Sequence, residues 1–373
     1  MKGISVYSRG LYMEVLLSKK DKNRLESLFL TLENNISIAD MFLEFCSHYG
    51  FVDEKRYKSE KDKEEAFAKE FLNFFEIEIE NKEDMNLYFS YIKKAIKKVD
   101  INYFKLNKYN QIVRPNIIKY GKYSLEYKKY YSLQPFVYDD VLVDENTFVE
   151  TSSIAFSEEE FSYLVIAKNN INWMCITPNE INTMQKYVDE CKGKVLTFGL
   201  GLGYYAFMAS EKDDVESVTI IENDVNIIKI FNENIIKFFP HKEKIKIINQ
   251  DAFSFYDKNN LDEYNYIFVD IYHDAEDGLP LYLEFKKREK YSQCKINYWL
   301  ENSIIAMFRR LFIILIREQY YRIDVDYNKK GNDLDKIISV LYEYTKTWKL
   351  TTFNQIVDIL KTKNLLKIIN EIV

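Results

Sequence analysis

The chain has 373 residues, which is enough for two or three domains around a large hydrophobic core. Hydrophobic residues make up 47% of it and charged residues 29%, the composition of an ordinary globular protein. The formal net charge of −6 argues against a broad nucleic-acid-binding surface, because such a surface requires clustered basic side chains. We therefore expect no nucleic-acid partner.

Cysteine and histidine are few and scattered. The four cysteines and three histidines form no CxxC pair or other ligand spacing, so the sequence predicts neither a disulfide framework nor a metal site. Residues 1–13 lack the apolar core of a secretory signal, and the longest apolar run, 311–316, is far too short to span a bilayer. These features predict a cytoplasmic protein that has no membrane partner.

The first part of the chain is predicted to be a helical domain, which we place at residues 1–125. Apolar residues recur at helical spacing at 36–45 and again at 67–75. Residues 92–99 have the pattern of a further amphipathic helix with a lysine-rich face. This domain could serve substrate choice, the formation of a homodimer or stability alone, and the sequence leaves these alternatives open.

A change in pattern follows at about residue 130. Short runs of strand-forming residues, separated by acidic turns, occur at 136–138, 141–143, 147–149 and 163–166. They are typical of hairpins, and we place a small antiparallel β unit at residues 126–176. Thr177-Pro-Asn-Glu180 then has the form of a capping box and predicts a helix that ends near residue 190.

Strands and helices alternate after residue 177. Strand-like apolar runs occur at 195–198, 218–221, 245–248, 266–269 and 297–300. Helical patterns between them predict βαβ units. The predicted fold class is therefore α/β, with a Rossmann-like, mostly parallel sheet and flanking helices. Residues 177–373 would form this domain together with a helical C-terminal extension, after the helical N-terminal domain and the β-hairpin unit.

The first strand of this domain ends in three alternate glycines, Gly199, Gly201 and Gly203, and a helical segment follows directly. Glycine tolerates φ > 0 and lets the backbone lie against a ligand, and a helix N-terminus presents unpaired N–H groups. A dinucleotide fingerprint would have its third glycine at position 204, where this chain has Tyr204. The loop therefore indicates a ligand site but disfavours a nicotinamide-dependent dehydrogenase.

Acidic residues follow the next three strands. Glu222 lies about twenty residues past the glycines, the distance expected of an acid that binds ribose hydroxyls. Asp251, which precedes Ala252 and Phe253, comes after the third strand, and Asp270 comes after the fourth. Because ligands of open parallel sheets bind at the carboxyl ends of strands, we expect these acids to line one site.

The glycine loop and the ordered acids resemble the class I S-adenosylmethionine-dependent methyltransferases, specifically their spermidine-synthase-like branch. The resemblance covers about residues 177–277 and implies S-adenosylmethionine as the cofactor. It implies that the three glycines lie beside the amino-acid part of the cofactor and that Glu222 holds the ribose. By the same resemblance, Asp251 and the two residues after it contact the adenine. Asp270 matches the acid that handles the attacking amine in aminopropyltransferases.

The chain departs from that superfamily at specific positions. Thr197 occupies a position where many methyltransferases have an acid, and Leu202 one where aminopropyltransferases usually have an aspartate. The Asp-Ser-Ser-Asp signature of aminopropyltransferases is replaced by Asp270-Ile-Tyr-His273. Because both aminopropyltransferase features are lost, we favour a methyltransferase that acts on a small-molecule acceptor of unknown identity.

Asp270 is the candidate base or orienting group, and His273 is the second candidate, because a histidine exchanges protons near neutral pH. Trp173 is equally compatible with a gate over the site and with the core of the hairpin unit. Two other functions stay open. One is an aminopropyltransferase, supported by Gln250-Asp-Ala-Phe253 and Asp270. The other is a non-catalytic scaffold of the same fold that binds a partner through its N-terminal helices.

Overall fold

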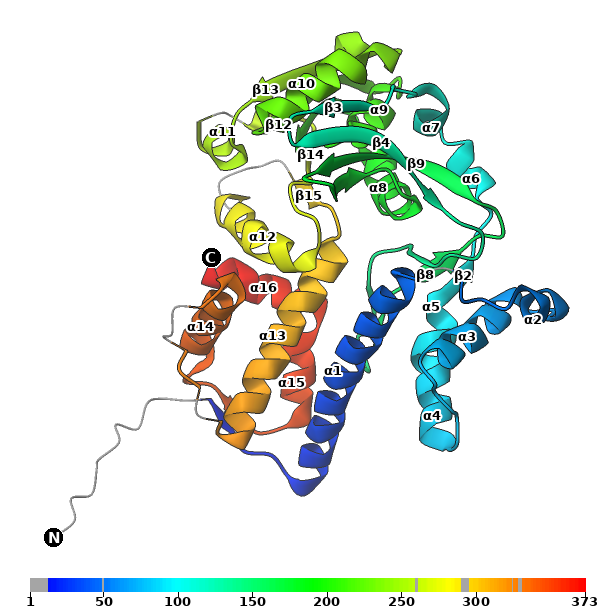
Figure 1. Cartoon of the computed structure of the whole chain (residues 1–373). Helices are drawn as coiled ribbons and strands as arrows, with labels where there is room; N and C mark the ends of the chain where they lie inside the picture. Colours follow the sequence, from blue (N-terminus) through cyan, green and yellow to red (C-terminus); the bar gives the residue numbers. More distant parts are fainter. Residues whose placement is uncertain (1–12, 49, 259–260, 290–294, 324, 328–330) are drawn as a thin grey trace.

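The structure is a computed structural model. It describes residues 13–48, 50–258, 261–289, 295–323, 325–327 and 331–373. Figure 1 shows the main sheets gathered in one half of the molecule, whereas two long helices, α1 (Lys19–Cys46) and α13 (Glu301–Tyr321), run side by side through the other half. Within the described residues, every helix is too short or too polar to traverse a lipid bilayer.

A five-stranded parallel sheet lies at the centre of the predicted Rossmann-like domain. Its strands are β11 (Gly193–Phe198), β12 (Val215–Glu222), β13 (Ile245–Asn249), β14 (Tyr266–Val269) and β15 (Ile296–Tyr298). They lie in the order β13-β12-β11-β14-β15, and every neighbouring pair is parallel. The prediction of a parallel α/β sheet is thus confirmed, and the strand order reverses between β11 and β14.

Helices cover this sheet on both faces. Helices α9 (Tyr204–Ser210) and α10 (Val225–Asn234) follow β11 and β12, whereas α11 (Ala252–Lys258) and α12 (Ala275–Glu289) precede and follow β14. Because crossovers between parallel strands are right-handed, helices on the two sides of the reversal lie on opposite faces. Strands covered in this way are nearly continuous apolar runs, which agrees with the full burial of β14.

A four-stranded antiparallel sheet precedes the parallel one. In the order β10-β9-β4-β3 it contains β3 (Ile118–Tyr120), β4 (Tyr123–Tyr130), β9 (Phe161–Lys168) and β10 (Ile171–Cys175). The sequence predicted the apolar run inside β9 but missed β3, β4 and β10, whose lysines, asparagine and tyrosines dilute the apolar pattern. Because β3 and the first residues of β4 precede residue 126, the sheet begins within the segment that was predicted to be helical.

The other short strands form smaller sheets. They are β2 (Ile96–Lys98), β8 (Ile154–Phe156) and β5 (Phe136–Val137) in one sheet, and β6 (Leu142–Val143) and β7 (Glu150–Thr151) in another. The helix predicted at 92–99 is therefore wrong in its second half, because α5 (Lys93–Ala95) ends before β2. Pairing of Ile96 with Ile154 outweighs the helical pattern there.

The remaining helices are distributed along the chain. Besides α1 they are α2 (Glu54–Ser59), α3 (Lys63–Phe74), α4 (Lys82–Leu87) with the π-helix η1 (Tyr88–Ile92), α6 (Asn102–Lys105), α7 (Lys108–Ile112), α8 (Pro178–Glu190), α14 (Asp333–Thr345), α15 (Phe353–Leu360) and α16 (Thr362–Ile372). The apolar patterns at 36–45 and 67–75 lie in α1 and mostly in α3, as predicted.

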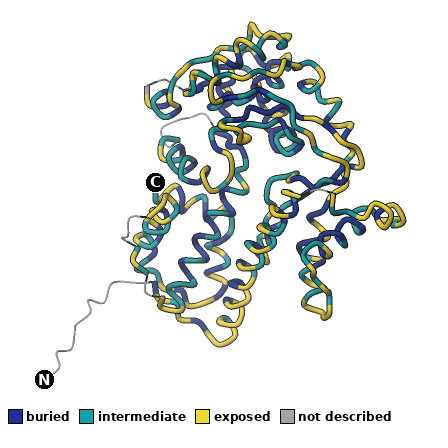
Figure 2. Tube along the Cα trace, in the orientation of Figure 1, coloured by how far each residue is buried: buried dark blue, intermediate teal, exposed yellow. Residues whose placement is uncertain are grey.

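The first and the last elements of the described residues also meet. Strand β1 (Glu14–Val15) pairs with β16 (Lys349–Leu350), and α1 contacts α13 and α15. Figure 2 shows buried residues along α13 as well as in the parallel sheet. The division at residues 125 and 176 stays a prediction, and β1 and α1 pack on segments of the C-terminal part of the chain.

Buried Asn35 on α1 connects three segments of the N-terminal half. Its amide donates to the Phe148 carbonyl (2.8 Å), and its oxygen accepts from the Tyr91 hydroxyl (3.0 Å) and the Glu150 N–H (3.1 Å). Because Asn35→Ala leaves these buried groups unpaired, we expect it to lower the free energy of unfolding by about 3 kcal/mol. Chemical denaturation measures this change. Asn34→Ala on the same helix is the control, and equal losses in both variants would contradict the prediction.

Candidate functional site

A cavity of about 660 Å³ opens at the carboxyl ends of β11, β12 and β14. This is the point where the strand order reverses, at which open parallel sheets bind their ligands. Of the nine residues that the sequence predicts for the site, eight line the cavity: Gly199, Gly201, Glu222, Asp251, Ala252, Phe253, Asp270 and His273. The ninth, Gly203, lies outside the lining.

Glycine occupies the three positions of the loop for different structural reasons. All have positive φ, at +101° for Gly199, +51° for Gly201 and +76° for Gly203. A Cβ on Gly199 would lie 1.9 Å from the Asp270 carbonyl oxygen, and one on Gly203 would lie 2.4 Å from the Phe231 ring. A Cβ on Gly201 would meet only the Met174 sulfur, at 3.9 Å. Packing within the protein therefore requires glycine at 199 and 203, whereas Gly201 is the open position.

This difference predicts unequal effects of alanine. We expect Gly203→Ala to lower the free energy of unfolding by about 3 kcal/mol, because the new methyl group collides with Phe231. Gly201→Ala should cost only about 1 kcal/mol, since it adds backbone strain without a collision. Denaturant titration of both variants tests the prediction, and similar losses would refute this account of the loop.

Glu222 joins the glycine loop to the end of β12. It is only 8% exposed, and its two carboxylate oxygens accept hydrogen bonds from the Leu200 N–H (3.2 Å) and the Asp224 N–H (2.7 Å). Burial raises the pKa of Glu222, and these backbone hydrogen bonds act in the opposite direction. Each oxygen keeps a further lone pair with which it can accept from a ligand hydroxyl.

Asp251, Ala252 and Phe253 lie at the start of α11, on another side of the cavity. Asp251 is exposed, and its Oδ1 accepts from the Ser254 N–H (2.8 Å), so it caps the helix. The Phe253 ring packs 4.9 Å from that of Phe285 and 4.8 Å from the Arg288 guanidinium. The sequence did not predict this packing, and it holds Phe253 at the cavity wall.

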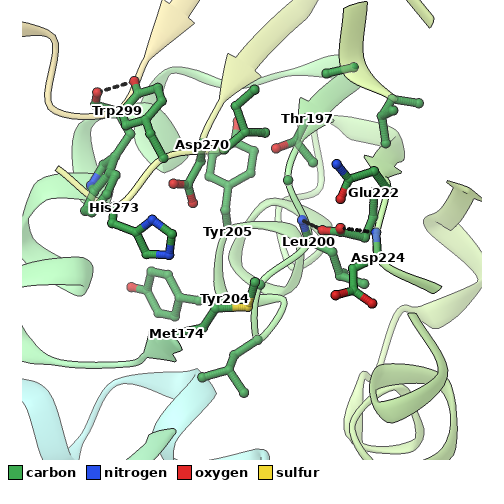
Figure 3. A pocket seen from close by; sticks show the side chains of 18 of the residues that line it. Met174, Thr197, Leu200, Tyr204, Tyr205, Glu222, Asp224, Asp270, His273 and Trp299 are labelled. Carbon is green, nitrogen blue, oxygen red and sulfur yellow. Dashed lines mark hydrogen bonds between the residues drawn. The ribbon is translucent and has the colours of Figure 1, made fainter. Parts of the chain in front are cut away.

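Asp270 follows β14 directly and projects its carboxyl group into the cavity. Figure 3 shows it beside His273 and Tyr205, with Glu222 and Asp224 on the opposite side. Burial, together with the negative charge of Glu222, raises the pKa of Asp270 to about 7. Among the described residues, no protein group donates a hydrogen bond or forms an ion pair with this carboxyl group.

Glu180 is a site residue that the sequence analysis missed. The expected helix cap forms in part, since the Thr177 hydroxyl accepts from the Glu180 N–H (3.4 Å), but the Glu180 side chain lines the cavity instead of completing the capping box. Burial and the charge of Asp270 raise its pKa well above the ordinary range. The Thr-x-x-Glu spacing already had a structural explanation, so it carried no signal of this second role.

His273 and Trp173 form the mouth of the site. The His273 side chain is 48% exposed, its Nδ1 lies 3.0 Å from the Asp277 carboxylate, and its ring meets Trp173 edge-on with centroids 4.6 Å apart. The register in which β10 pairs with β9 shifts between Asn172 and Met174. Trp173 is therefore the extra residue of a β-bulge. The Lys168 ammonium lies 3.7 Å from its ring centre. Trp173 therefore lines the cavity and is not part of a hairpin core.

The antiparallel sheet and α7 are anchored to the site. The Tyr123 hydroxyl on β4 donates to Asp224 (2.5 Å), and the Tyr109 hydroxyl on α7 donates to the Leu202 carbonyl in the glycine loop (2.6 Å). Residues 168 and 173–175 of this sheet line the cavity, as does Ile176 directly after it. The parallel sheet therefore supplies one side of the site and the preceding sheet covers it. Within the described residues, no group of three or more His, Cys, Asp or Glu side chains is arranged to hold a metal ion.

No protein-family profile matches the chain, and no curated protein matches it. Solved structures with partial similarity include spermidine synthase from Thermotoga maritima, at 16% identity and a TM-score of 0.29 over 40% of this chain and 59% of that one. A spermidine synthase from Corynebacterium glutamicum ATCC 13032, whose assignment is provisional, has 12% identity and a TM-score of 0.28 over 47% and 58% of the two chains. An O-methyltransferase from Klebsiella pneumoniae, also provisional, has 17% identity and a TM-score of 0.24 over 32% and 52%. The chain thus spans little more than half the length of each of these proteins.

Proposed function

We propose that the protein is an S-adenosylmethionine-dependent methyltransferase that acts on a small-molecule acceptor. The observation that carries this proposal is the cavity at the reversal of the sheet, which is lined by the glycine loop and by carboxyl groups after three strands. Carboxylates accept hydrogen bonds from ribose hydroxyls and adenine amines, and they attract a positive charge. A nucleoside with a cationic sulfonium arm therefore suits this lining.

Each part of the cavity has a role in the proposal. Glu222 would accept from the ribose hydroxyls, and Asp251 with its two following residues would hold the adenine. The backbone near Gly201 would lie along the amino-acid part. When bound, S-adenosylmethionine supplies an electrophilic methyl group. The protein contributes mainly by holding the acceptor in line with that group, and Asp270 takes the proton that the acceptor loses.

Calorimetric titration tests the proposal directly. We expect S-adenosylmethionine and its demethylated product, S-adenosylhomocysteine, to bind with micromolar dissociation constants and one-to-one stoichiometry. If neither ligand produces heat at millimolar concentration, the proposal fails, and the non-catalytic scaffold becomes the better account. In that case, surface substitutions in the N-terminal helices should alter the protein's effect in the cell, whereas Asp270→Asn should not.

One observation favours an aminopropyltransferase as the second candidate. Glu180 and Asp270 place two carboxyl groups in the cavity, and no described residue forms an ion pair with either. Such a lining suits a donor that lacks a carboxylate and an acceptor that is an amine. Decarboxylated S-adenosylmethionine should then bind at least about tenfold more tightly than S-adenosylmethionine, and putrescine should be consumed. Equal affinities without consumption of putrescine would exclude this candidate.

A further inference from the structure

The proposed methyl transfer, as described so far, gives Glu180 no role. It occupies the first turn of α8, where its carboxylate could have bonded back to the helix cap, yet its side chain lines the cavity. Ionised carboxylates that are removed from water need a positive partner or several hydrogen bonds. Within the described residues, Glu180 has neither, and the charge that acts on it is the like charge of Asp270.

Other ionisable groups also face this part of the cavity. Glu222 lies at the end of β12, Lys168 at the end of β9, and His273 after β14. Cys175 at the end of β10 and Tyr204 at the start of α9 also line the cavity. The Lys168 ammonium lies over Trp173, and His273 is paired with Asp277, so both side chains are engaged at the mouth.

We propose that Glu180 is a second acid of the transfer site, which stays protonated and donates a hydrogen bond towards Asp270, so that Asp270 is the only anion that receives the acceptor's proton. This inference rests on the proposed methyl transfer. A carboxylic acid that a poorly solvated site keeps neutral at pH 7 is a hydrogen-bond donor. Such bonds are often long in the empty site and shorten when a ligand is bound. By stabilising the Asp270 anion, Glu180 acts as a positioning residue.

The reaction needs one anion to receive the acceptor's proton. The acceptor heteroatom forms a bond to the methyl carbon, and the sulfur–methyl bond breaks with its electron pair on sulfur. The acceptor's proton passes to the Asp270 carboxylate. One positive charge and one negative charge therefore disappear together, so the transfer leaves the net charge of the site unchanged. An ionised Glu180 would add a second negative charge beside Asp270, which burial and the like charge of Asp270 disfavour.

The affinities of two ligands report the charge near Glu180 and Asp270. S-adenosylmethionine and S-adenosylhomocysteine differ by a methyl group and one positive charge, so the ratio of their affinities reports the negative charge near the sulfur atom. We would measure this ratio by calorimetry between pH 6 and 9. In the unaltered protein, we expect it to rise in favour of S-adenosylmethionine as Asp270 ionises, around pH 7. Titration of the ligands' own amino groups is common to all variants and cancels in the comparison.

Three variants give distinct expected results. Asp270→Asn should abolish the rise near pH 7, because it removes the anion. Glu180→Gln should keep the ratio within about twofold and the midpoint unchanged, because an amide replaces a neutral donor of the same shape. Glu180→Ala should move the midpoint upward by about one pH unit, because the Asp270 anion loses a hydrogen bond worth about 1.5 kcal/mol. Glu190→Gln, at the exposed far end of α8, is the control and should change nothing.

A downward shift of the midpoint in the Glu180 variants would overturn the inference. If Glu180 is ionised, both Glu180→Gln and Glu180→Ala remove a negative charge, so the midpoint falls and the ratio at pH 8 drops. If neither variant changes the midpoint, Glu180 contributes nothing and the inference is also wrong. Failure of both ligands to bind the unaltered protein would instead refute the proposed function. A wrong pattern with intact binding would refute only the role of Glu180.

Discussion

Glu222→Gln is expected to weaken the binding of S-adenosylmethionine at least about 100-fold. A carboxylate accepts from both ribose hydroxyls through charge-assisted hydrogen bonds, and the amide removes the charge and one acceptor. The loss of about 3 kcal/mol corresponds to a hundredfold change in the dissociation constant. Calorimetric titration with S-adenosylmethionine measures the effect.

The control must separate ligand contact from loop stability. Glu222 also accepts from the Leu200 and Asp224 N–H groups, so the free energy of unfolding should be measured for the same variant. Glu216→Gln, at an exposed position on the same strand, should leave affinity unchanged. If Glu222→Gln binds within threefold of the unaltered protein, Glu222 does not hold the ribose.

Asp270→Asn is expected to stabilise the ligand-free protein at high pH while it removes the proton acceptor. The pKa of Asp270 is about 7 in the folded state and about 4 in an unfolded chain. Between these values the folded state binds more protons, so the free energy of unfolding falls as pH rises from about 4 to about 7. Asparagine removes this penalty. At pH 8 we expect a gain of about 2 kcal/mol, and at pH 4 none.

Thermal and denaturant unfolding at the two pH values test this sign. Asp213→Asn, at an exposed position, is the control and should show no pH-dependent gain. Equal stability of Asp270→Asn and the unaltered protein at pH 8 would mean that Asp270 is well solvated and ionises as an ordinary aspartate. A gain in stability at the cost of activity is the pattern expected of a residue kept in an unfavourable environment for function.

The predicted site was accessible from the sequence because its residues obey a local rule. Glu222, Asp251 and Asp270 each follow an apolar run, and the carboxyl ends of parallel strands meet at one edge of the sheet. The helix after Thr177 was accessible for the same reason, since a helix cap depends on neighbouring residues alone. The roles of these residues toward a ligand stay proposals.

Pairing between distant segments determined several strands that local sequence patterns could not predict. Residues 96–98 form a strand because β8 lies beside them, and β4 pairs with β9 although tyrosine and lysine interrupt its apolar pattern. Trp173 reaches the cavity through a bulge that only the register of β10 on β9 creates. Such contacts join segments that are distant in the chain, so the sequence near each residue does not contain them.

By itself, the sequence determined the parallel α/β sheet, the glycine loop and the acids at its edge, because strand periodicity and strand ends are local properties. Only the tertiary structure decided that Gly203 serves packing against Phe231 and that Glu180 lines the same cavity as Asp270. Both outcomes depend on which side chains from other elements occupy the neighbouring space. That space exists only after the helices and the second sheet have packed around the strands.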